Sequence, residues 1–336
     1  MSNREEIHSF ASQFLDVAME YANICQVDRL ALGDSSFDLY TNGKNLVSSR
    51  LKSAFFSSEA EKANDTLVIW ENLEKFKLPV AKWSSSFHYP LGQVNERLST
   101  PFRVAIDRHT GTISVYDKER RIGAVWRSNL AGLPYWSIAT PFRVILSWFA
   151  DQEGGEFVHS AAISRGDSAL LISGPSGSGK STLSLFAALN GYDLISDDYL
   201  VVKENLAYAV YTRGKVHENA SFYNLVRSGV VAESSNFGEK RIINLLESPI
   251  RVSRSSQIRG IVLPIVTGLT AYARISSSEA FRLVAPYSIS GLLGGNSNSL
   301  RRISSLTRNV PATRFALAHA PSENLKALEE IFEQVS

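Results

Sequence analysis

Hydrophobic residues in the first part of the chain follow two periods. Within residues 5–25, Phe10, Phe14, Val17 and Tyr21 recur at spacings of four, three and four, which is the period of an amphipathic helix. Short runs rich in β-branched and aromatic residues follow; they are FDLYT, TLVIW, FRVAID, TISVYD and GAVWR. Such runs, separated by Asn-Gly and His-Thr-Gly turns, are typical of strands. The pattern therefore predicts a β-rich region against which the helix packs.

A change of pattern near residue 150 predicts a domain boundary. Residues 140–150 (TPFRVILSWFA) are typical of a buried helix, and the polar run DQEGGE follows them. We therefore expect two domains: a β-rich α+β N-terminal domain over residues 1–150 and an α/β domain over residues 151–336. The first shows neither a metal-ligand cluster nor a nucleophile beside an obvious base. We expect it to bind a substrate or a partner, or to serve as a scaffold.

The second domain has the strand and helix order of an α/β fold. EFVHSAAIS and SALLIS predict two buried strands joined by the turn 165–167. From Ser168 the order is strand, glycine-rich loop, helix, strand, acidic pair and strand. The tail, SENLKALEEIFEQV, predicts a packing helix that follows Pro321 and has Ser322 as its N-cap. The apolar face of that helix consists of Leu325, Leu328, Phe332 and Val335.

The glycine-rich loop GPSGSGKST fits the phosphate-binding pattern G-x-x-x-x-G-K-[ST]. Glycines let the backbone turn tightly so that N–H groups converge, and the helix that follows adds its positive end. We expect Lys180 to reach the β- and γ-phosphates of a nucleotide and the Ser181 hydroxyl to bind Mg²⁺. The alternative is a glycine-rich turn that binds nothing. The expected nucleotide-binding residues are Gly174, Pro175, Ser176, Gly177, Ser178, Gly179, Lys180, Ser181 and Thr182.

Two adjacent acids follow the next predicted strand. Asp197 and Asp198 come after YDLIS, seventeen residues beyond Lys180. One helix and one strand therefore return the chain to the strand-end face where α/β sheets bind their ligands. Adjacent side chains point in different directions, so one carboxylate can hold Mg²⁺ while the other accepts the proton of an attacking hydroxyl. The alternative is a solvated turn or a helix cap.

The stretch from VHSAAIS through GPSGSGKSTLSLFAALNGYDLISDDYLVV (Val158–Val202) resembles the C-terminal catalytic domain of HPr kinase/phosphorylase. It resembles more closely the HPr-kinase-like serine kinases of bacterial gene clusters, some of which phosphorylate peptide precursors. The resemblance covers about 45 residues. It implies a phosphoenolpyruvate-carboxykinase-like P-loop fold and ATP-dependent phosphorylation of a serine hydroxyl, and it adds a homo-oligomer to the expectations. The N-terminal part does not resemble the N-terminal domain of HPr kinase.

Carried over residue by residue, the resemblance makes Asp197 and Asp198 the catalytic pair. It implies that Asp197 is the base and that Asp198 and Ser181 bind Mg²⁺; the reverse assignment of the two acids stays open. His159 stands where the family has a histidine before the loop. A neutral imidazole there would bond a phosphate oxygen or orient an aspartate, and a hydrogen-bonded core histidine is the alternative. YTRGKVHENASFYNL replaces the family's glycine-rich segment, which argues against the reverse phosphorylase reaction.

Composition and charge narrow the range of partners. Of the 336 residues, 44% are hydrophobic, and 35 Lys+Arg against 33 Asp+Glu give a net charge of +2, which argues against nucleic-acid binding through bulk charge. Cys25 is the only cysteine, so we expect no intramolecular disulfide, no cysteine-based zinc site and a reducing, cytoplasmic setting. Because no secretory signal and no apolar run of the roughly 20 residues that span a bilayer is seen, we expect no membrane partner.

Positive charge is concentrated in residues 251–314, which contain nine arginines, no lysine and one acid. Arginine binds phosphate and carboxylate groups bidentately. Arg301 and Arg302, just after the polar run GGNSNS, are the best placed by sequence to reach a γ-phosphate or an acidic substrate. Lys240 and Arg241 form a second candidate pair. The alternative is that these side chains form surface ion pairs or cover the core.

The sequence therefore predicts a two-domain cytoplasmic kinase. We expect it to use ATP and Mg²⁺ and to transfer the γ-phosphate to a serine-type hydroxyl of a peptide or protein. Two alternatives stay open. One is a kinase for free serine or another small hydroxyl metabolite, and the other is a nucleotide-binding regulatory module that transfers no phosphate.

Overall fold

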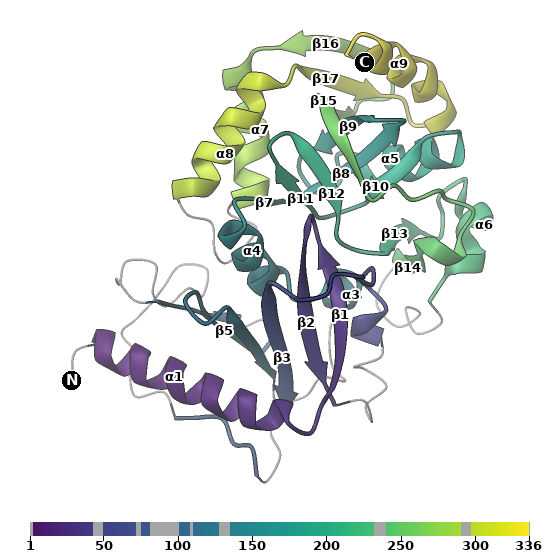
Figure 1. The fold of residues 1–336 in the computed structure, drawn as a ribbon. Coiled ribbons are helices and arrows are strands. Elements are labelled where there is room, and N and C mark those ends of the chain that lie inside the picture. The colour runs from purple at the N-terminus through teal and green to yellow at the C-terminus, as the bar shows by residue number, and fades with distance from the viewer. Residues whose placement is uncertain are drawn as a thin grey trace. The chain divides into compact units, whose positions relative to one another are not determined.

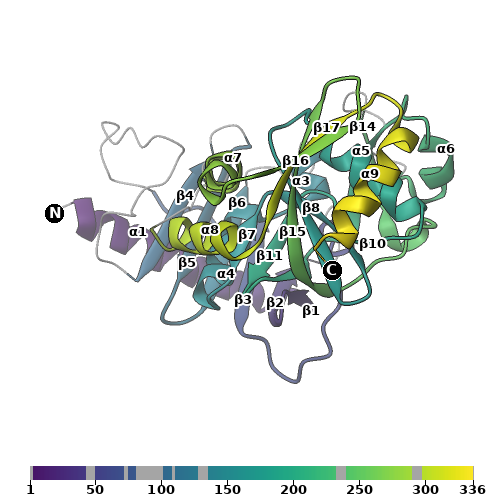
Figure 2. The same ribbon diagram turned by 90° about the horizontal axis from the view of Figure 1, so that it is seen from above.

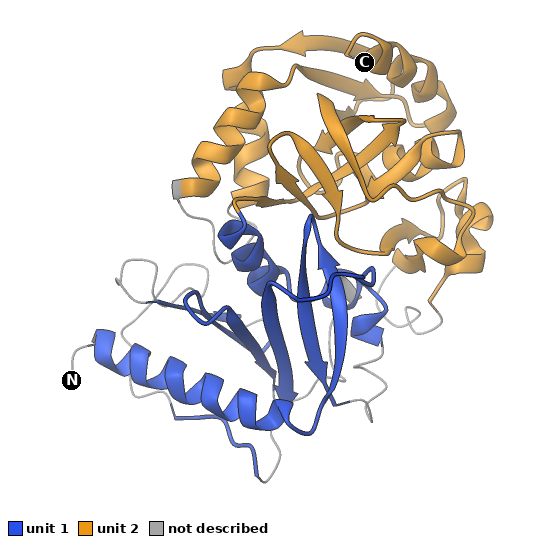
Figure 3. Ribbon diagram, in the orientation of Figure 1, with its two compact units in different colours: residues 1–153, 292–296 blue, residues 154–291, 297–336 orange. Residues whose placement is uncertain are grey.

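The computed structural model divides into two compact units. It describes residues 3–42, 50–71, 75–80, 101–107, 110–127, 135–231, 240–289 and 297–335. Unit 1 extends from the N-terminus to Glu153, and unit 2 begins at Gly154 (Figure 3). The division lies after Glu153 rather than at the expected residue 150, because helix α4 continues to Gln152. Among the helices of the described residues, none is both long and apolar enough to cross a membrane.

Both units combine helices with sheets, and the main sheet of each contains parallel and antiparallel pairs, so the chain as a whole has the expected mixed α/β architecture. In unit 1 the sheet order is β1-β2-β3-β6-β5-β4. The β2–β3 and β3–β6 pairs are parallel, and the other pairs are antiparallel. The elements of unit 1 are α1 (Asn3–Ala22), β1 (Gln26–Leu32), β2 (Ser35–Thr41), β3 (Asp65–Glu71), β4 (Phe102–Asp107), β5 (Thr112–Asp117), β6 (Ile122–Arg127), α3 (Tyr135–Ala139) and α4 (Arg143–Gln152).

Aromatic side chains attach α1 to the sheet of unit 1. Phe10, Phe14 and Tyr21 are at most 3% exposed, as the helical spacing predicts, and the Phe14 ring lies 5.4 Å from the Trp70 ring of β3. On β6, a Cβ atom added to Gly123 would lie 2.5 Å from the Ile145 side chain of α4, so α4 packs closely on that strand. All five predicted strands of this region form.

Unit 2 is built around a sheet in the order β10-β8-β9-β15-β12-β11-β7, with β17 joining β15 and β16 (Figures 1 and 2). Strands β13 and β14 form a separate two-stranded sheet. The elements are β7 (Glu156–Val158), β8 (Ser160–Arg165), β9 (Ser168–Ser173), α5 (Lys180–Leu189), β10 (Asp193–Ser196), β11 (Leu200–Lys203), β12 (Leu206–Ala209), β13 (Arg213–His217), α6 (Tyr223–Val226), η3 (Arg227–Gly229), β14 (Lys240–Asn244), η5 (Leu245–Glu247), β15 (Ser255–Val266), β16 (Ala271–Ile275), α7 (Ser277–Ile289), α8 (Ser297–Asn309), β17 (Ala312–Leu317) and α9 (Pro321–Glu333).

Strand direction brings three chain segments to one edge of this sheet. Strand β8 lies between β9 and β10 and is antiparallel to both, so β9 and β10 run in the same direction. The loop after β9 and the acidic pair after β10 therefore leave the sheet at the same edge. His159 precedes β8 and belongs to that edge as well, because the next residue, Ser160, pairs with Ser173 at the end of β9.

Three local predictions were wrong. EFVHSAAIS was expected to be one strand, but it forms β7 and β8, because the chain changes partners at His159: β7 pairs with β11, and β8 pairs with β9 and β10. The N-cap of α9 is Ala320 and not Ser322, since Pro321 occupies the first turn, where its missing N–H costs nothing. The run GGNSNS was expected to be a connection, but 297–299 begin α8, and 294–296 lie outside the described residues.

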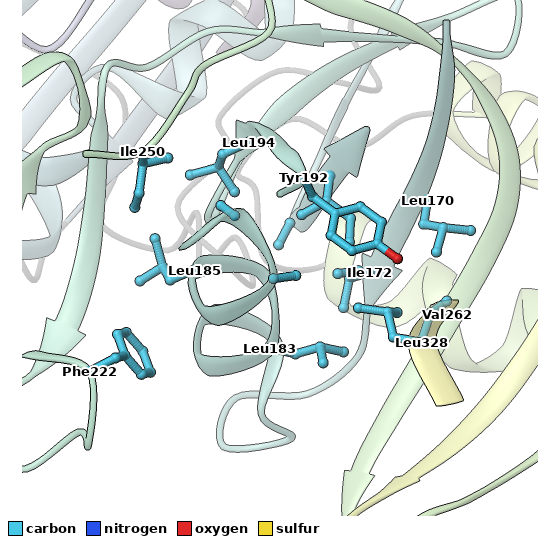
Figure 4. Close-up of a cluster of buried hydrophobic side chains, with 14 of the residues drawn as sticks. Leu170, Ile172, Leu183, Leu185, Tyr192, Leu194, Phe222, Ile250, Val262 and Leu328 are labelled. Atoms are coloured by element: carbon cyan, nitrogen blue, oxygen red, sulfur yellow. The ribbon is translucent and has the colours of Figure 1, made fainter. Parts of the chain in front are cut away.

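Helix α5 lies against a large buried cluster in unit 2. It packs on β8, β10 and β13 and beside α9. Figure 4 shows Leu185 of α5 between Ile250 and Phe222, and all three belong to this cluster. Leu328 of α9 belongs to it too, so the tail helix packs as predicted. Because α5 begins at the glycine-rich loop, this cluster fixes the position of the loop.

We expect Leu185→Ala to destabilise the protein by about 2 to 5 kcal/mol, because Leu185 is fully buried and its loss leaves a cavity in the cluster. Leu225→Ala removes the same atoms from a side chain that is 60% exposed, and we expect a change within about 0.5 kcal/mol. Urea unfolding of the two variants measures both changes. Equal losses would contradict the assignment of α5 to the core.

Candidate functional site

The glycine-rich loop joins β9 to α5 and turns back on itself. Gly177 and Gly179 have φ angles of 82° and 98°, in the left-handed region that favours glycine. Helix α5 begins at Lys180. The Lys180 ammonium donates hydrogen bonds to the carbonyl oxygens of Gly174 (2.7 Å) and Pro175 (3.0 Å). The loop thus encloses the start of the helix with the lysine inside it.

The exposure of the loop residues differs along its length. Pro175, Ser176, Gly177 and Thr182 are exposed, whereas Ser178 and Lys180 are buried. Burial lowers the pKa of Lys180, and the carboxylates of Asp198 and Asp197 act in the opposite direction. The lysine is therefore held where a nearby negative charge stabilises it.

A pocket lies directly beside the loop. Its volume is about 410 Å³, and its lining includes residues 173–178, the end of β15 at 263–266, and Leu283, Tyr287 and Arg314. This volume is within the range of pockets that bind small molecules. A second cavity, in unit 1 beside Arg127 and Arg143, has only about 80 Å³, which is below that range.

The two aspartates at the end of β10 are both buried. Asp197 is 1% exposed and Asp198 is 8% exposed. The Asp198 Oδ1 atom lies 3.0 Å from His159 Nε2, and its Oδ2 atom accepts a 2.6 Å hydrogen bond from the ammonium of Lys215. The Asp197 Oδ2 atom accepts a 2.8 Å hydrogen bond from the backbone N–H of Lys215. One residue of β13 therefore contacts both carboxylates.

The surroundings push the pKa values of the two acids in opposite directions. Burial acts against ionisation of Asp198, but the Lys215 ammonium and the hydrogen bond to His159 outweigh it, so the pKa of Asp198 lies far below its ordinary value. Burial raises the pKa of Asp197, and Lys215 only partly offsets this. Asp198 is thus held as a carboxylate, whereas Asp197 has the greater tendency to take up a proton.

His159 is held in place between an aspartate and a tyrosine. Its ring stacks on Tyr199 with centroids 4.6 Å apart and an angle of 13° between the rings. Tyr199 in turn stacks on Phe157 of β7. The histidine side chain is 23% exposed, so it contacts Asp198 from the edge of the site.

Several buried oxygens at this edge fit a polar ligand. Four of them lack a partner at hydrogen-bonding distance within the part of the chain that the structure describes: Asp197 Oδ1 and the hydroxyl oxygens of Ser160, Ser173 and Ser178. The Ser181 hydroxyl is nevertheless close enough to Asp197 to lower the pKa of its carboxyl. Buried polar groups are normally satisfied by protein, water or ligand. A phosphate with Mg²⁺ would supply partners for both kinds of group: phosphate oxygens would accept hydrogen bonds from the serine hydroxyls, and the cation would bind the carboxylate oxygen.

The ligand set suits Mg²⁺ bound together with a nucleotide. Among the described residues, no group of three or more His, Cys, Asp or Glu side chains could hold a metal ion by itself. Mg²⁺ usually takes one or two protein ligands and completes its shell with phosphate oxygens and water. Ser181, at the start of α5, and one carboxylate of the acidic pair form such a set.

The arginines and lysines that the sequence singled out lie in different places. Lys240 is near enough to Lys180 to act on its charge, whereas Arg241 is hydrogen-bonded to Glu218. Arg302 pairs with Glu156 at 3.5 Å, and Arg301 is exposed on α8. Arg241 and Arg302 thus pair with acids that lie outside the loop, Glu218 and Glu156.

Lys215 is the site residue that sequence reasoning missed. It lies in the segment YTRGKVHENASFYNL. A lysine beside a glycine in a strand is an ordinary feature, and nothing in the spacing connects it with residues 197 and 198. The signal that could have found it is the need of two buried carboxylates for a nearby cation.

Compared with models of protein families and with curated proteins, the chain matches none.

We expect Gly179→Ala to destabilise the protein by about 2 to 4 kcal/mol. An alanine there has an unfavourable φ, and its Cβ would lie 2.7 Å from Leu317 Cδ1, so the buried Leu317 must shift. Gly177→Ala is the matched control, because it has a similar φ and no atom within 4 Å of the added Cβ; it should cost about 1 to 2 kcal/mol. Urea unfolding compares them, and a Gly177 variant that loses more stability would contradict the described packing.

Proposed function

We propose that this protein is an ATP- and Mg²⁺-dependent kinase that transfers the γ-phosphate to a serine-type hydroxyl of a peptide or protein. The observation that carries the proposal is the meeting of the glycine-rich loop with two buried carboxylates of unequal pKa at one sheet edge. Phosphoryl transfer requires these parts: a phosphate cradle, a cation ligand and a proton acceptor.

The loop and its lysine serve the nucleotide phosphates. Backbone N–H groups of Ser176, Gly177 and Gly179 and the N-terminus of α5 would bind phosphate oxygens. Lys180, whose four-carbon side chain now ends on two loop carbonyls, would turn to the β- and γ-phosphates. The pocket of about 410 Å³ beside the loop would take the nucleoside, with Tyr287 among the side chains at its wall.

The two aspartates would divide the remaining work. Asp198 remains ionised and, with the Ser181 hydroxyl, would bind Mg²⁺, which neutralises charge on the β- and γ-phosphates when it is bound. Asp197 would accept the proton of the attacking hydroxyl at Oδ1, the oxygen that has no hydrogen-bond partner in the described residues. Its raised pKa suits this role, because a base works best when its pKa approaches the working pH.

The same carboxylates favour a kinase over a module that only binds nucleotide. Burying a carboxyl costs free energy, and a module without phosphotransfer needs no proton acceptor beside its phosphate loop. The resemblance of Val158–Val202 to HPr-kinase-like serine kinases supports a serine-type hydroxyl as the acceptor and a phosphoenolpyruvate-carboxykinase-like P-loop fold for unit 2. A binding role for unit 1 fits a peptide or protein acceptor.

We expect Asp197→Asn to lower the turnover number about 10²- to 10⁴-fold while ATP binding stays within a few-fold of wild type, because the amide cannot accept the proton. Lys180→Ala should weaken ATP binding itself. The measurement is incubation of the purified protein with γ-labelled ATP, Mg²⁺ and a cell extract, followed by separation of labelled peptides from labelled small molecules.

Asp167→Asn is the matched control, since Asp167 is an exposed aspartate in the turn after β8; it should transfer label as the wild type does. Label on free serine or another small molecule would replace the peptide acceptor with a metabolite. ATP binding without transfer to any acceptor would reduce the protein to a nucleotide-binding module.

A further inference from the structure

The Lys215 ammonium is hydrogen-bonded to a carboxylate oxygen of Asp198, the residue proposed to bind Mg²⁺. The Lys215 ammonium lies 2.6 Å from Asp198 Oδ2, and His159 Nε2 lies 3.0 Å from Oδ1. The side chains of Lys215 and Asp198 are 14% and 11% exposed, so water screens this contact little. Both oxygens of this carboxylate are already in contact with a hydrogen-bonding nitrogen.

The two acids of the site already have cations beside them before any ligand arrives. The carboxylates of Asp197 and Asp198 face the ammonium groups of Lys180 and Lys215, and Lys215 is the strongest charge acting on each carboxyl. The charges of Lys215 and Lys240 both act against that of Lys180. A divalent cation that entered alone would add two positive charges to a poorly screened site that already holds these lysines. A cation that entered with a nucleotide triphosphate would bring compensating negative charge.

The attachment of Lys215 lets its ammonium leave while its backbone stays. Its N–H is bonded to Asp197 Oδ2, and β13 is held to β14 by pairing at every residue of the strand. The flexible four-carbon side chain carries the charge. Lys215 can therefore release Asp198 and reach a new anion without moving the acidic pair.

We infer that the Lys215 ammonium acts as a counter-cation of Asp198 and prevents a divalent metal ion from binding there in the absence of nucleotide. When a nucleotide binds, its phosphates attract the ammonium away from Asp198, and the metal ion can then bind. The inference rests on the proposed function, in which Asp198 binds Mg²⁺. It makes Lys215 a positioning residue that couples metal binding to nucleotide binding.

The test is a titration of the nucleotide-free protein with Mn²⁺, followed by electron paramagnetic resonance of the free ion. We expect Lys215→Met to bind Mn²⁺ about tenfold or more tightly than the wild type, because the competing charge is gone. Lys215→Arg keeps the charge and should bind Mn²⁺ no more tightly than the wild type does. Lys326→Met is the matched control, since it removes one exposed positive charge from α9, and it should leave the affinity unchanged.

Lys215→Met leaves two buried carboxylates with less compensation, so its folding is followed too. If the variant is unstable, millimolar Mg²⁺ without nucleotide should raise its thermal midpoint and leave that of the wild type unchanged, because a ligand that binds only the folded state stabilises it. An Mn²⁺ affinity of Lys215→Met within twofold of wild type, or an equal midpoint shift in both proteins, would overturn the inference.

The titration contains neither ATP nor an acceptor, so its result is independent of phosphotransfer. If label transfer is found but Lys215→Met binds Mn²⁺ as the wild type does, the kinase proposal stands and the counter-cation role fails. If the metal affinity rises but ATP neither binds nor transfers phosphate, the proposed function fails instead, and Lys215 remains a counter-cation of the acidic pair.

Discussion

The burial of two adjacent carboxylates is the constraint on which the functional edge of unit 2 depends. A carboxylate removed from water needs a cation and hydrogen-bond donors to compensate the lost hydration. Asp198 obtains them from Lys215 and His159, and Asp197 obtains a backbone N–H of Lys215. The positions of β13 and of the residue between β7 and β8 therefore follow from the electrostatic needs of the acidic pair, in addition to hydrophobic packing.

Topology explains why this compensation is found beside the glycine-rich loop. Strand β8 runs opposite to β9 and β10, so the ends of the two outer strands and the start of the middle one lie together. The hydrophobic cluster that contains the buried side chains of α5 fixes the start of this helix, and with it the loop, at that edge. Apolar packing thus places the backbone, and buried charge then determines which side chains are tolerated there.

Sequence patterns predicted the parts of the site that are continuous in the chain. The loop, the helix after it and the acidic pair follow one another within 25 residues (174–198), and the motif of the loop and the order of the elements around it were enough to propose them. The break at His159 was missed because it depends on which strands β7 and β8 pair with, which their own residues do not encode. Lys215 was missed because its partners lie in the bend after β10, far from it in the sequence, and its own strand shows only an ordinary alternation of residues.

The presence of lysine rather than arginine at position 215 indicates whether the positive charge beside Asp198 serves only stability or also ligand binding. A guanidinium would offer Asp198 several donors in a fixed geometry and would hold it more firmly. An ammonium at the end of a flexible chain gives one short contact to Oδ2 and exchanges partners more readily. A site evolved only for stability gains more from the arginine, or from an apolar pair in place of both charges. A site that must receive phosphate and metal in one step gains from a cation that can change partners, and the lysine on β13 is such a cation.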